Sequence, residues 1–116
     1  MKSAVISKGN PKFVAGNPEA DRFYHELKLF LEQLGYAVSF DAGEPYTSPM
    51  VADVWIGHSR GSDRLRFASA GTKTIAVGIL GGINHPNDTS LSRGQIPDAA
   101  HYLLTDEMKE RIKQAL

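Results

Sequence analysis

The feature that most constrains this chain is a series of short apolar runs that alternate with segments of helical periodicity. The runs are Ala4–Ser7, Tyr36–Phe40, Val51–Ile56 and Thr74–Leu80. Apolar runs of this length, rich in β-branched or aromatic residues and bounded by turn formers, predict buried β-strands. Strands that alternate with helices build βαβ units, so the sequence predicts an α/β fold with a mostly parallel sheet.

Three segments carry the helical signal. The first begins at Asn17–Pro18, where asparagine is a favourable N-cap and proline a favourable first helical residue, and it ends at Gly35. Apolar residues recur at helical spacing between these limits. The segment Ser62–Ala70 predicts a second, short helix. A final helix follows the N-cap residue Thr105 and continues to the end of the sequence.

The carboxyl-terminal third is less regular. The stretch Gly81–Pro97 is polar and interrupted by glycine, asparagine and proline, which predicts a long loop. The run His101–Leu104 is a candidate fifth strand. The 116 residues together predict a single domain, 1–116, of three layers with a mostly parallel sheet of about five strands. Ligands bind beyond the carboxyl ends of such strands, so the loops Lys8–Gly16 and Gly57–Gly61 are expected to form any site, with Gly81–Pro97 beside them.

Composition excludes several classes of function. The 13 basic residues balance the 13 acidic ones, so there is no cationic excess for a dedicated nucleic-acid binder. The absence of cysteine excludes a disulfide framework, a thiolate zinc site and a cysteine nucleophile. The first apolar run is too short for a signal peptide, and no run approaches the roughly 20 apolar residues of a membrane helix. We therefore expect a cytoplasmic protein with no membrane partner, and we leave a homodimer open.

One motif carries chemistry. The third apolar run leads directly into Gly57-His58-Ser59-Arg60-Gly61, which matches the pattern G-x-S-x-G, and a predicted helix follows. A serine on a tight strand-to-helix turn has a strained backbone, and its hydroxyl projects above the edge of the sheet. The residues two before and two after it approach each other closely, which requires small residues at both positions. The first N–H groups of the following helix suit a developing oxyanion.

The segment Val54–Ser62 resembles the nucleophile elbow of the α/β-hydrolase-fold serine hydrolases. The resemblance extends to Ser3–Pro11, which is similar to the first core strand and oxyanion loop, and to Tyr36–Tyr46, which is similar to the next strand with its D-x-G-type loop. The stretch His101–Glu107 is similar to the region around the catalytic histidine of that family. The fold usually has about eight strands, whereas this chain has room for about five.

The resemblance implies a serine hydrolase that acts on an ester, thioester or amide of a small molecule. Its expected partner is therefore a small-molecule substrate, and we expect no metal or cofactor. Ser59 is then the nucleophile, with Gly57, His58 and Gly61 completing the elbow. The implied base is His101, with His85 as its rival, and the implied acid is Asp88 or Asp98, which lie between Ser59 and His101 as the family order requires. The implied oxyanion donors are backbone N–H groups of Arg60 and of Gly9 or Asn10.

The two predictions for the region around His101 exclude each other. A parallel fifth strand that begins at His101 would place this histidine at the amino edge of the sheet, opposite the site. A catalytic His101 needs Ala99–Tyr102 to be a loop that returns over the carboxyl edge, with Leu103–Thr105 leading into the last helix. Of the other histidines, we expect His58 to be a packing residue and His25 to be solvated.

The alternative belongs to another class. A parallel sheet with glycine-rich turns is also the frame of flavodoxin-like and Rossmann-like domains that bind a ligand without catalysis. The turn Gly57–Gly61 would then hold a phosphate-containing ligand, with Arg60 or Arg64 pairing with it, or the domain would bind a protein partner. A phosphate binder does not need a histidine near Ser59, whereas a hydrolase does.

Overall fold

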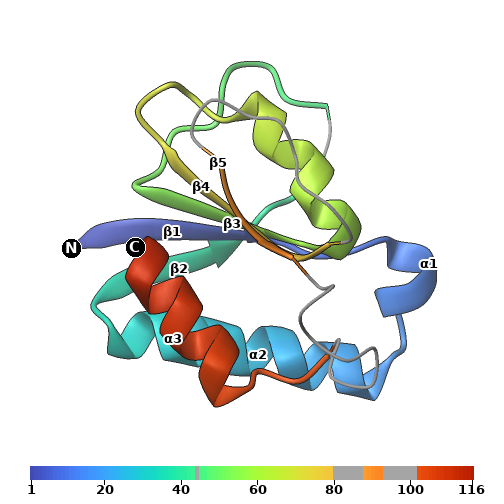
Figure 1. Cartoon of the computed structure of the whole chain (residues 1–116). Coiled ribbons are helices and arrows are strands. Elements are labelled where there is room, and N and C mark those ends of the chain that lie inside the picture. The colour runs from blue at the N-terminus through green and yellow to red at the C-terminus, as the bar shows by residue number, and fades with distance from the viewer. Residues whose placement is uncertain (44, 80–87, 93–101) are drawn as a thin grey trace.

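The computed structural model describes residues 1–43, 45–79, 88–92 and 102–116, and it has an α/β architecture around a parallel sheet. The strands are β1 (Lys2–Ser7), β2 (Tyr36–Phe40), β3 (Val54–His58), β4 (Lys73–Ile79) and β5 (Asp88–Ser92). Their order in the sheet is β2-β1-β3-β4-β5, and every neighbouring pair is parallel. All the carboxyl ends therefore meet at one edge of the sheet, which is where α1 and the start of η1 lie (Figure 1).

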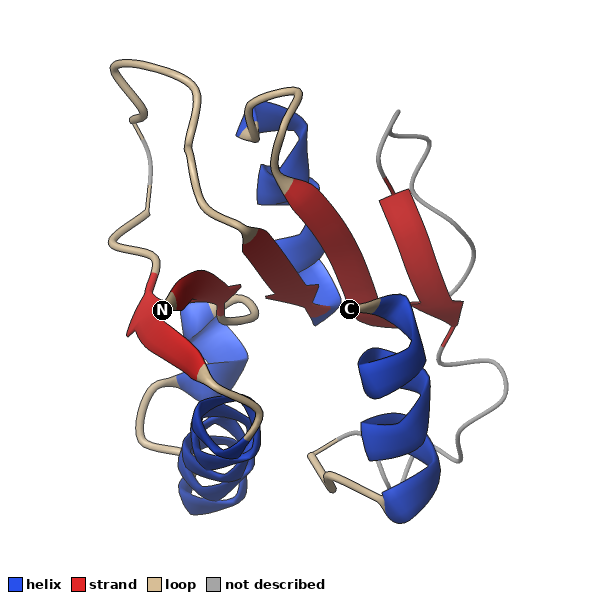
Figure 2. Cartoon of the chain, turned by 90° about the vertical axis from the view of Figure 1, so that its left-hand side faces the viewer, coloured by secondary structure: helices blue, strands red, loops and turns tan. Residues whose placement is uncertain are grey.

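The helices divide between the two faces of the sheet. They are α1 (Pro11–Val14), α2 (Pro18–Gln33), the 3₁₀-helix η1 (Ser59–Phe67) and α3 (Asp106–Ala115). Helices α2 and α3 cover one face and η1 lies over the other, so three layers are present (Figures 1 and 2). None of the helices in the described part of the chain is long and apolar enough to cross a membrane.

Two apolar clusters hold these layers together. The larger one lies between the sheet and helices α2 and α3, and it includes Phe23, Leu27 and Ile112, all fully buried. The smaller one lies between the sheet and η1 and is built around Trp55 and Leu65. Every residue of β3 is buried, because this strand is the middle one and both its faces are covered.

The helix boundaries follow the predicted caps. The side chain of Asn17 accepts hydrogen bonds from the N–H groups of Glu19 and Ala20 at the start of α2. Gly35 follows α2 with a φ of 96°, a left-handed conformation that glycine adopts without strain. The hydroxyl of Thr105 accepts from the Met108 N–H at the start of α3. Side-chain caps satisfy N–H groups that have no partner inside the helix, which is why these starts are readable in the sequence.

The structure shifts two of the predicted elements. The third strand begins at Val54 rather than Val51, whose side chain is 80% exposed, and it continues through His58. The helix predicted over Ser62–Ala70 begins at Ser59 and is a 3₁₀-helix. Apolar periodicity marked the buried part of each element, whereas hydrogen bonding between strands and the geometry of the turn set their ends.

The structure corrects two predictions for the carboxyl-terminal third and adds one short helix near the amino terminus. A strand over His101–Leu104 is wrong, because Tyr102 lies in a turn and Leu103–Thr105 leads without regular structure into α3; His101 itself lies outside the described residues. The strand beside β4 is β5, inside the stretch predicted to be a continuous loop. The short helix α1, capped by the Asn10 side chain, was not predicted.

Candidate active site

Ser59 lies on a strained turn at the carboxyl edge of the sheet. It directly follows β3 and is the first residue of η1. Its φ is 55°, and it is the one non-glycine residue with a positive φ among those the structure describes. This conformation is unfavourable for a residue with a Cβ and persists only where the surrounding structure imposes it. The prediction of a strained strand-to-helix turn at Ser59 is confirmed.

The two glycines of the motif allow this turn to form. A Cβ on Gly57 would lie 2.5 Å from the Cα of Ser62, inside the first turn of η1. A Cβ on Gly61 would lie 2.5 Å from the carbonyl oxygen of Lys8 and would also overlap that of Ser7. The contact at Gly57 lies within the turn between β3 and η1. The contact at Gly61 packs the start of η1 directly against the end of β1. Both positions exclude every residue with a side chain.

The side chain of Ser59 is partly exposed and lies beside the loop that follows β1. A Cβ placed on Gly9 would be 3.5 Å from the Cβ of Ser59. The buried hydroxyl of Ser62 donates to the carbonyl oxygen of Ser59 and fixes the first turn of η1. The nucleophile candidate is therefore accessible while its backbone is held from two sides.

Backbone N–H groups near Ser59 differ in their availability. The N–H of Arg60 lies in the first turn of η1, where N–H groups have no intrahelical partner. The N–H of Gly9 donates to the hydroxyl of Tyr24 over 2.9 Å and is already engaged. Asn10 is the N-cap of α1, and among the described residues its N–H has no hydrogen-bond partner. Of the two donors expected in this loop, Asn10 is the one left free.

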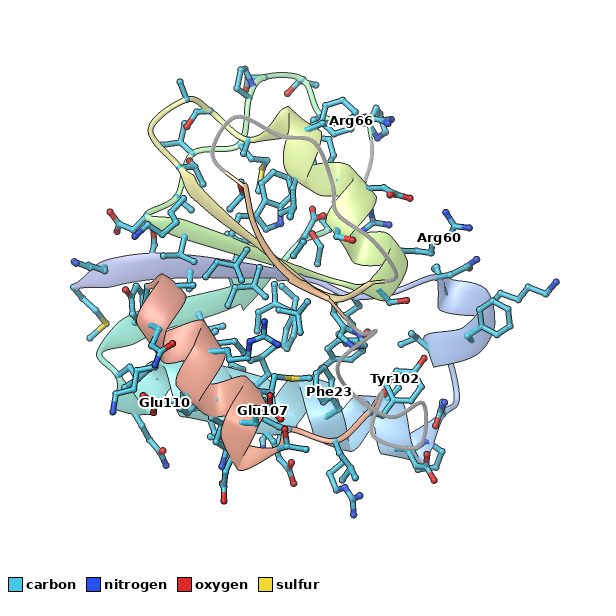
Figure 3. All side chains as sticks on the ribbon, in the orientation of Figure 1. Phe23, Arg60, Arg66, Tyr102, Glu107 and Glu110 are labelled. Atoms are coloured by element: carbon cyan, nitrogen blue, oxygen red, sulfur yellow. The ribbon has the colours of Figure 1, made fainter. Side chains whose placement is uncertain are left out.

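His58 is buried on the face of the sheet that α2 covers. Its Nδ1 lies 2.8 Å from the hydroxyl of Tyr24, and its ring packs against Phe23 at 4.5 Å and Tyr102 at 5.8 Å between centroids. Figure 3 shows Phe23 and Tyr102 on this same side of the sheet. Burial raises the pKa of Tyr24 above its ordinary value, which favours the neutral hydroxyl still more strongly. His58 is a packing residue, as expected.

A second polar cluster lies on the opposite face, around Asp41 at the end of β2. Its carboxylate, 2% exposed, accepts hydrogen bonds from the hydroxyls of Ser7 and Tyr46 and from the N–H of Gly43, and pairs with Arg64 of η1 at 3.3 Å. The Ser7 hydroxyl in turn accepts from the indole N–H of Trp55. Burial alone would raise the pKa of Asp41, but these hydrogen bonds and the Arg64 charge outweigh it and hold the pKa below its usual value.

The remaining predicted site residues are only partly described. His101, His85 and Asp98 lie outside the described residues, and Asp88 is described only as the first residue of β5. His25 is exposed on α2, as expected. Neither histidine in the described part of the chain is therefore a candidate for the base. The structure places Gly9 beside Ser59, with Asn10 and Arg60 next to them in the chain, and the Arg60 side chain extends into solvent (Figure 3).

The sequence analysis missed the roles of Tyr24 and Asp41. Tyr24 directly follows Phe23 on the apolar face of α2, so the sequence predicts that its ring is buried. The sequence does not indicate which groups its hydroxyl contacts. Asp41 is the first residue of the D-x-G sequence Asp41-Ala42-Gly43, which was a signal for a structured loop. Its partners on β1 and η1 are distant in sequence and could not be assigned.

Comparisons with known proteins do not assign a family or a function to this chain. No protein-family model matches the chain, and neither the curated proteins nor the solved structures contain a match. In the described segments, no group of three or more histidine, cysteine or acidic side chains is placed to hold a metal ion. The candidate site therefore rests on its own geometry.

The close packing of Gly61 leads to a first prediction. We expect Gly61→Ala to destabilise the fold by at least 3 kcal/mol, or to prevent folding, because the new methyl group meets two backbone carbonyls that cannot move apart cheaply. Urea unfolding followed by tryptophan fluorescence measures the change. Gly71→Ala is the matched control, since a Cβ there meets nothing within 4 Å. Equal stability of the two variants would contradict the close approach of η1 to β1.

The Asp41 cluster leads to a prediction about pH. A carboxyl group with a lowered pKa stabilises the fold above its unfolded pKa and loses that contribution as the pH falls through its folded pKa. Asp41→Asn should therefore reduce the free energy of unfolding clearly at pH 7, and the difference from the wild type should shrink below about pH 4. Asp63→Asn is the control, because Asp63 pairs with Arg60 on the surface and such pairs contribute little. A difference that is constant from pH 7 to pH 3 would contradict this account.

Proposed function

We propose that this protein is a serine hydrolase that cleaves a small ester, thioester or amide, with Ser59 as its nucleophile. The observation that carries the proposal is the positive φ of Ser59 on a turn between a buried parallel strand and a helix. A turn that only connects two elements has no need for a strained residue with a side chain, and a glycine would serve there at lower cost. Strain of this kind accumulates at sites where it presents a reactive group.

The proposed reaction uses the groups around the turn. The Oγ of Ser59 attacks the substrate carbonyl carbon while a histidine accepts its proton, and the carbonyl oxygen becomes an oxyanion. Backbone N–H groups at the start of η1 and after β1 donate to this oxyanion. Collapse breaks the bond to the leaving group, which takes the proton from the histidine. Water then hydrolyses the acyl-enzyme by the same route, and Ser59 regains its proton.

We propose His101 as the base, with Asp88 or Asp98 as its orienting acid. Tyr102, which follows His101 in the chain, packs its ring against His58, the residue before Ser59. The chain therefore returns to the neighbourhood of the elbow at Tyr102 and then enters α3 without forming a strand. The absence of a strand over Leu103–Thr105 is one part of what a catalytic His101 requires, and it supports His101 over His85.

The alternative, a non-catalytic domain that binds a phosphate-containing ligand, is favoured by one observation. The strand order β2-β1-β3-β4-β5 is the flavodoxin-like order, in which ligands bind at the carboxyl edge. Against it, Arg64 is engaged by the buried carboxylate of Asp41, and Arg60 pairs with Asp63. Neither arginine is reserved for a phosphate group, so we prefer the hydrolase.

A fluorophosphonate probe tests the proposal directly. We expect the wild-type protein to be labelled and Ser59→Ala to lose all labelling, because the probe reacts only with an activated serine hydroxyl. Ser69→Ala is the control, since Ser69 is a partly buried serine outside the turn. Intact-protein mass spectrometry measures the adduct. An unlabelled wild-type protein that instead binds inorganic phosphate would favour the alternative.

The two candidate bases can be separated with a small activated ester such as p-nitrophenyl acetate. We expect His101→Ala to lower kcat by at least about 100-fold, because the Ser59 hydroxyl then lacks its proton acceptor. His85→Ala should keep kcat within about threefold of the wild type. The opposite pattern would assign the base to His85.

A further inference from the structure

The hydroxyl of Tyr24 occupies a position that the proposed chemistry does not explain. It reaches from α2 to the carboxyl edge of the sheet and touches both segments that border Ser59. It accepts the N–H of Gly9, in the loop after β1, and it forms a 2.8 Å hydrogen bond with the Nδ1 of His58, at the end of β3. Tyr24 is 1% exposed, so these are bonds of a buried polar group, where an unmade bond is costly.

The hydroxyl of Tyr24 is the common hydrogen-bond partner of two groups. It accepts from the N–H of Gly9, and it shares a hydrogen bond with the Nδ1 of His58 whose donor depends on the tautomer of the imidazole. The loop after β1, helix α2 and strand β3 are thereby joined by two directional bonds next to the turn at Ser59.

This arrangement selects between two backbone donors. Gly9 and Asn10 are consecutive in the loop that lies beside the turn, where a Cβ on Gly9 would lie 3.5 Å from the Cβ of Ser59, so their N–H groups are the ones this loop offers next to the proposed nucleophile. The N–H of Gly9 is consumed by Tyr24, whereas that of Asn10 has no partner among the described residues. An oxyanion hole needs donors that are free and fixed in place before the reaction.

We propose that Tyr24 is a positioning residue that takes the Gly9 N–H out of the oxyanion hole and leaves the Asn10 N–H as its donor from this loop. The inference rests on the proposed hydrolase function and names the second donor that acts with the Arg60 N–H. Tyr24 does not touch the substrate. It fixes the position and direction of the loop, and the cap formed by the Asn10 side chain on Lys12 continues this order into α1.

The backbone at Asn10 allows a test that removes one N–H. Asn10 has a φ of −56°, which proline adopts, so Asn10→Pro deletes the N–H without forcing the backbone to change at that residue. Asn10→Ala is the matched control, because it also removes the side-chain cap but keeps the N–H. With p-nitrophenyl acetate we expect Asn10→Pro to have a kcat about 100-fold below that of Asn10→Ala, with a similar KM.

Tyr24→Phe tests the positioning role with two readouts. We expect kcat to fall about tenfold at unchanged KM, because the loop loses its fixed orientation. Hydrogen exchange of the Gly9 amide, followed by NMR, should become at least tenfold faster. Tyr36→Phe is the control, since Tyr36 is a buried tyrosine at the start of β2, at the edge of the sheet away from Ser59. This variant should leave both kcat and the exchange rate of the Gly9 amide unchanged.

The outcomes separate this inference from the proposed function. A labelled, active wild-type protein in which Asn10→Pro equals Asn10→Ala would overturn the inference and leave the hydrolase standing. Unchanged exchange of the Gly9 amide in Tyr24→Phe would overturn it as well. A wild-type protein that neither hydrolyses the ester nor reacts with the fluorophosphonate would overturn both proposals.

Discussion

The close approach of Gly61 to the carbonyl oxygens of Ser7 and Lys8 is the contact on which the rest of the site depends. It brings the start of η1 against the end of β1, although the two segments are about fifty residues apart in sequence. With any side chain at this position, η1 would be displaced from the sheet and Ser59 would not lie beside Gly9. The absence of a Cβ at Gly61 therefore allows Ser59 to lie beside the loop that contains Gly9 and Asn10.

The end of β1 is also held by polar clusters from both faces of the sheet. On the face covered by α2, the hydroxyl of Tyr24 binds the Gly9 N–H and His58. On the face covered by η1, the carboxylate of Asp41 binds the Ser7 hydroxyl and Arg64. One cluster is built on a neutral phenol and the other on an ionised carboxylate. Burial raises the pKa of Tyr24 and so reinforces its neutral form, while hydrogen bonds and the Arg64 charge lower the pKa of Asp41 and reinforce its ionised form. Donors that are fixed in this way need no reorganisation when charge develops on a substrate.

Several features of the fold could be predicted because they depend on local interactions. The apolar runs gave β1, β2 and β4 to within two residues at either end, and the N-caps Asn17 and Thr105 gave the starts of α2 and α3. The strained turn at Ser59 followed from the spacing of Gly57 and Gly61. The strand β5 was missed because its sequence, Asp88–Ser92, is mostly polar and carries no apolar run. Its pairing with β4, rather than its composition, makes it a strand.

What the sequence by itself determined is the alternation of strands and helices, the parallel sheet and the position of the elbow. These follow from periodicity, caps and glycine spacing, all of which act over a few residues. Only the tertiary structure decided which backbone N–H near Ser59 is free, because that depends on where a tyrosine on α2 directs its hydroxyl across the edge of the sheet. A hydrogen bond between residues far apart in sequence forms only when the strand order brings them together and both groups point toward each other. A local sequence pattern specifies neither condition.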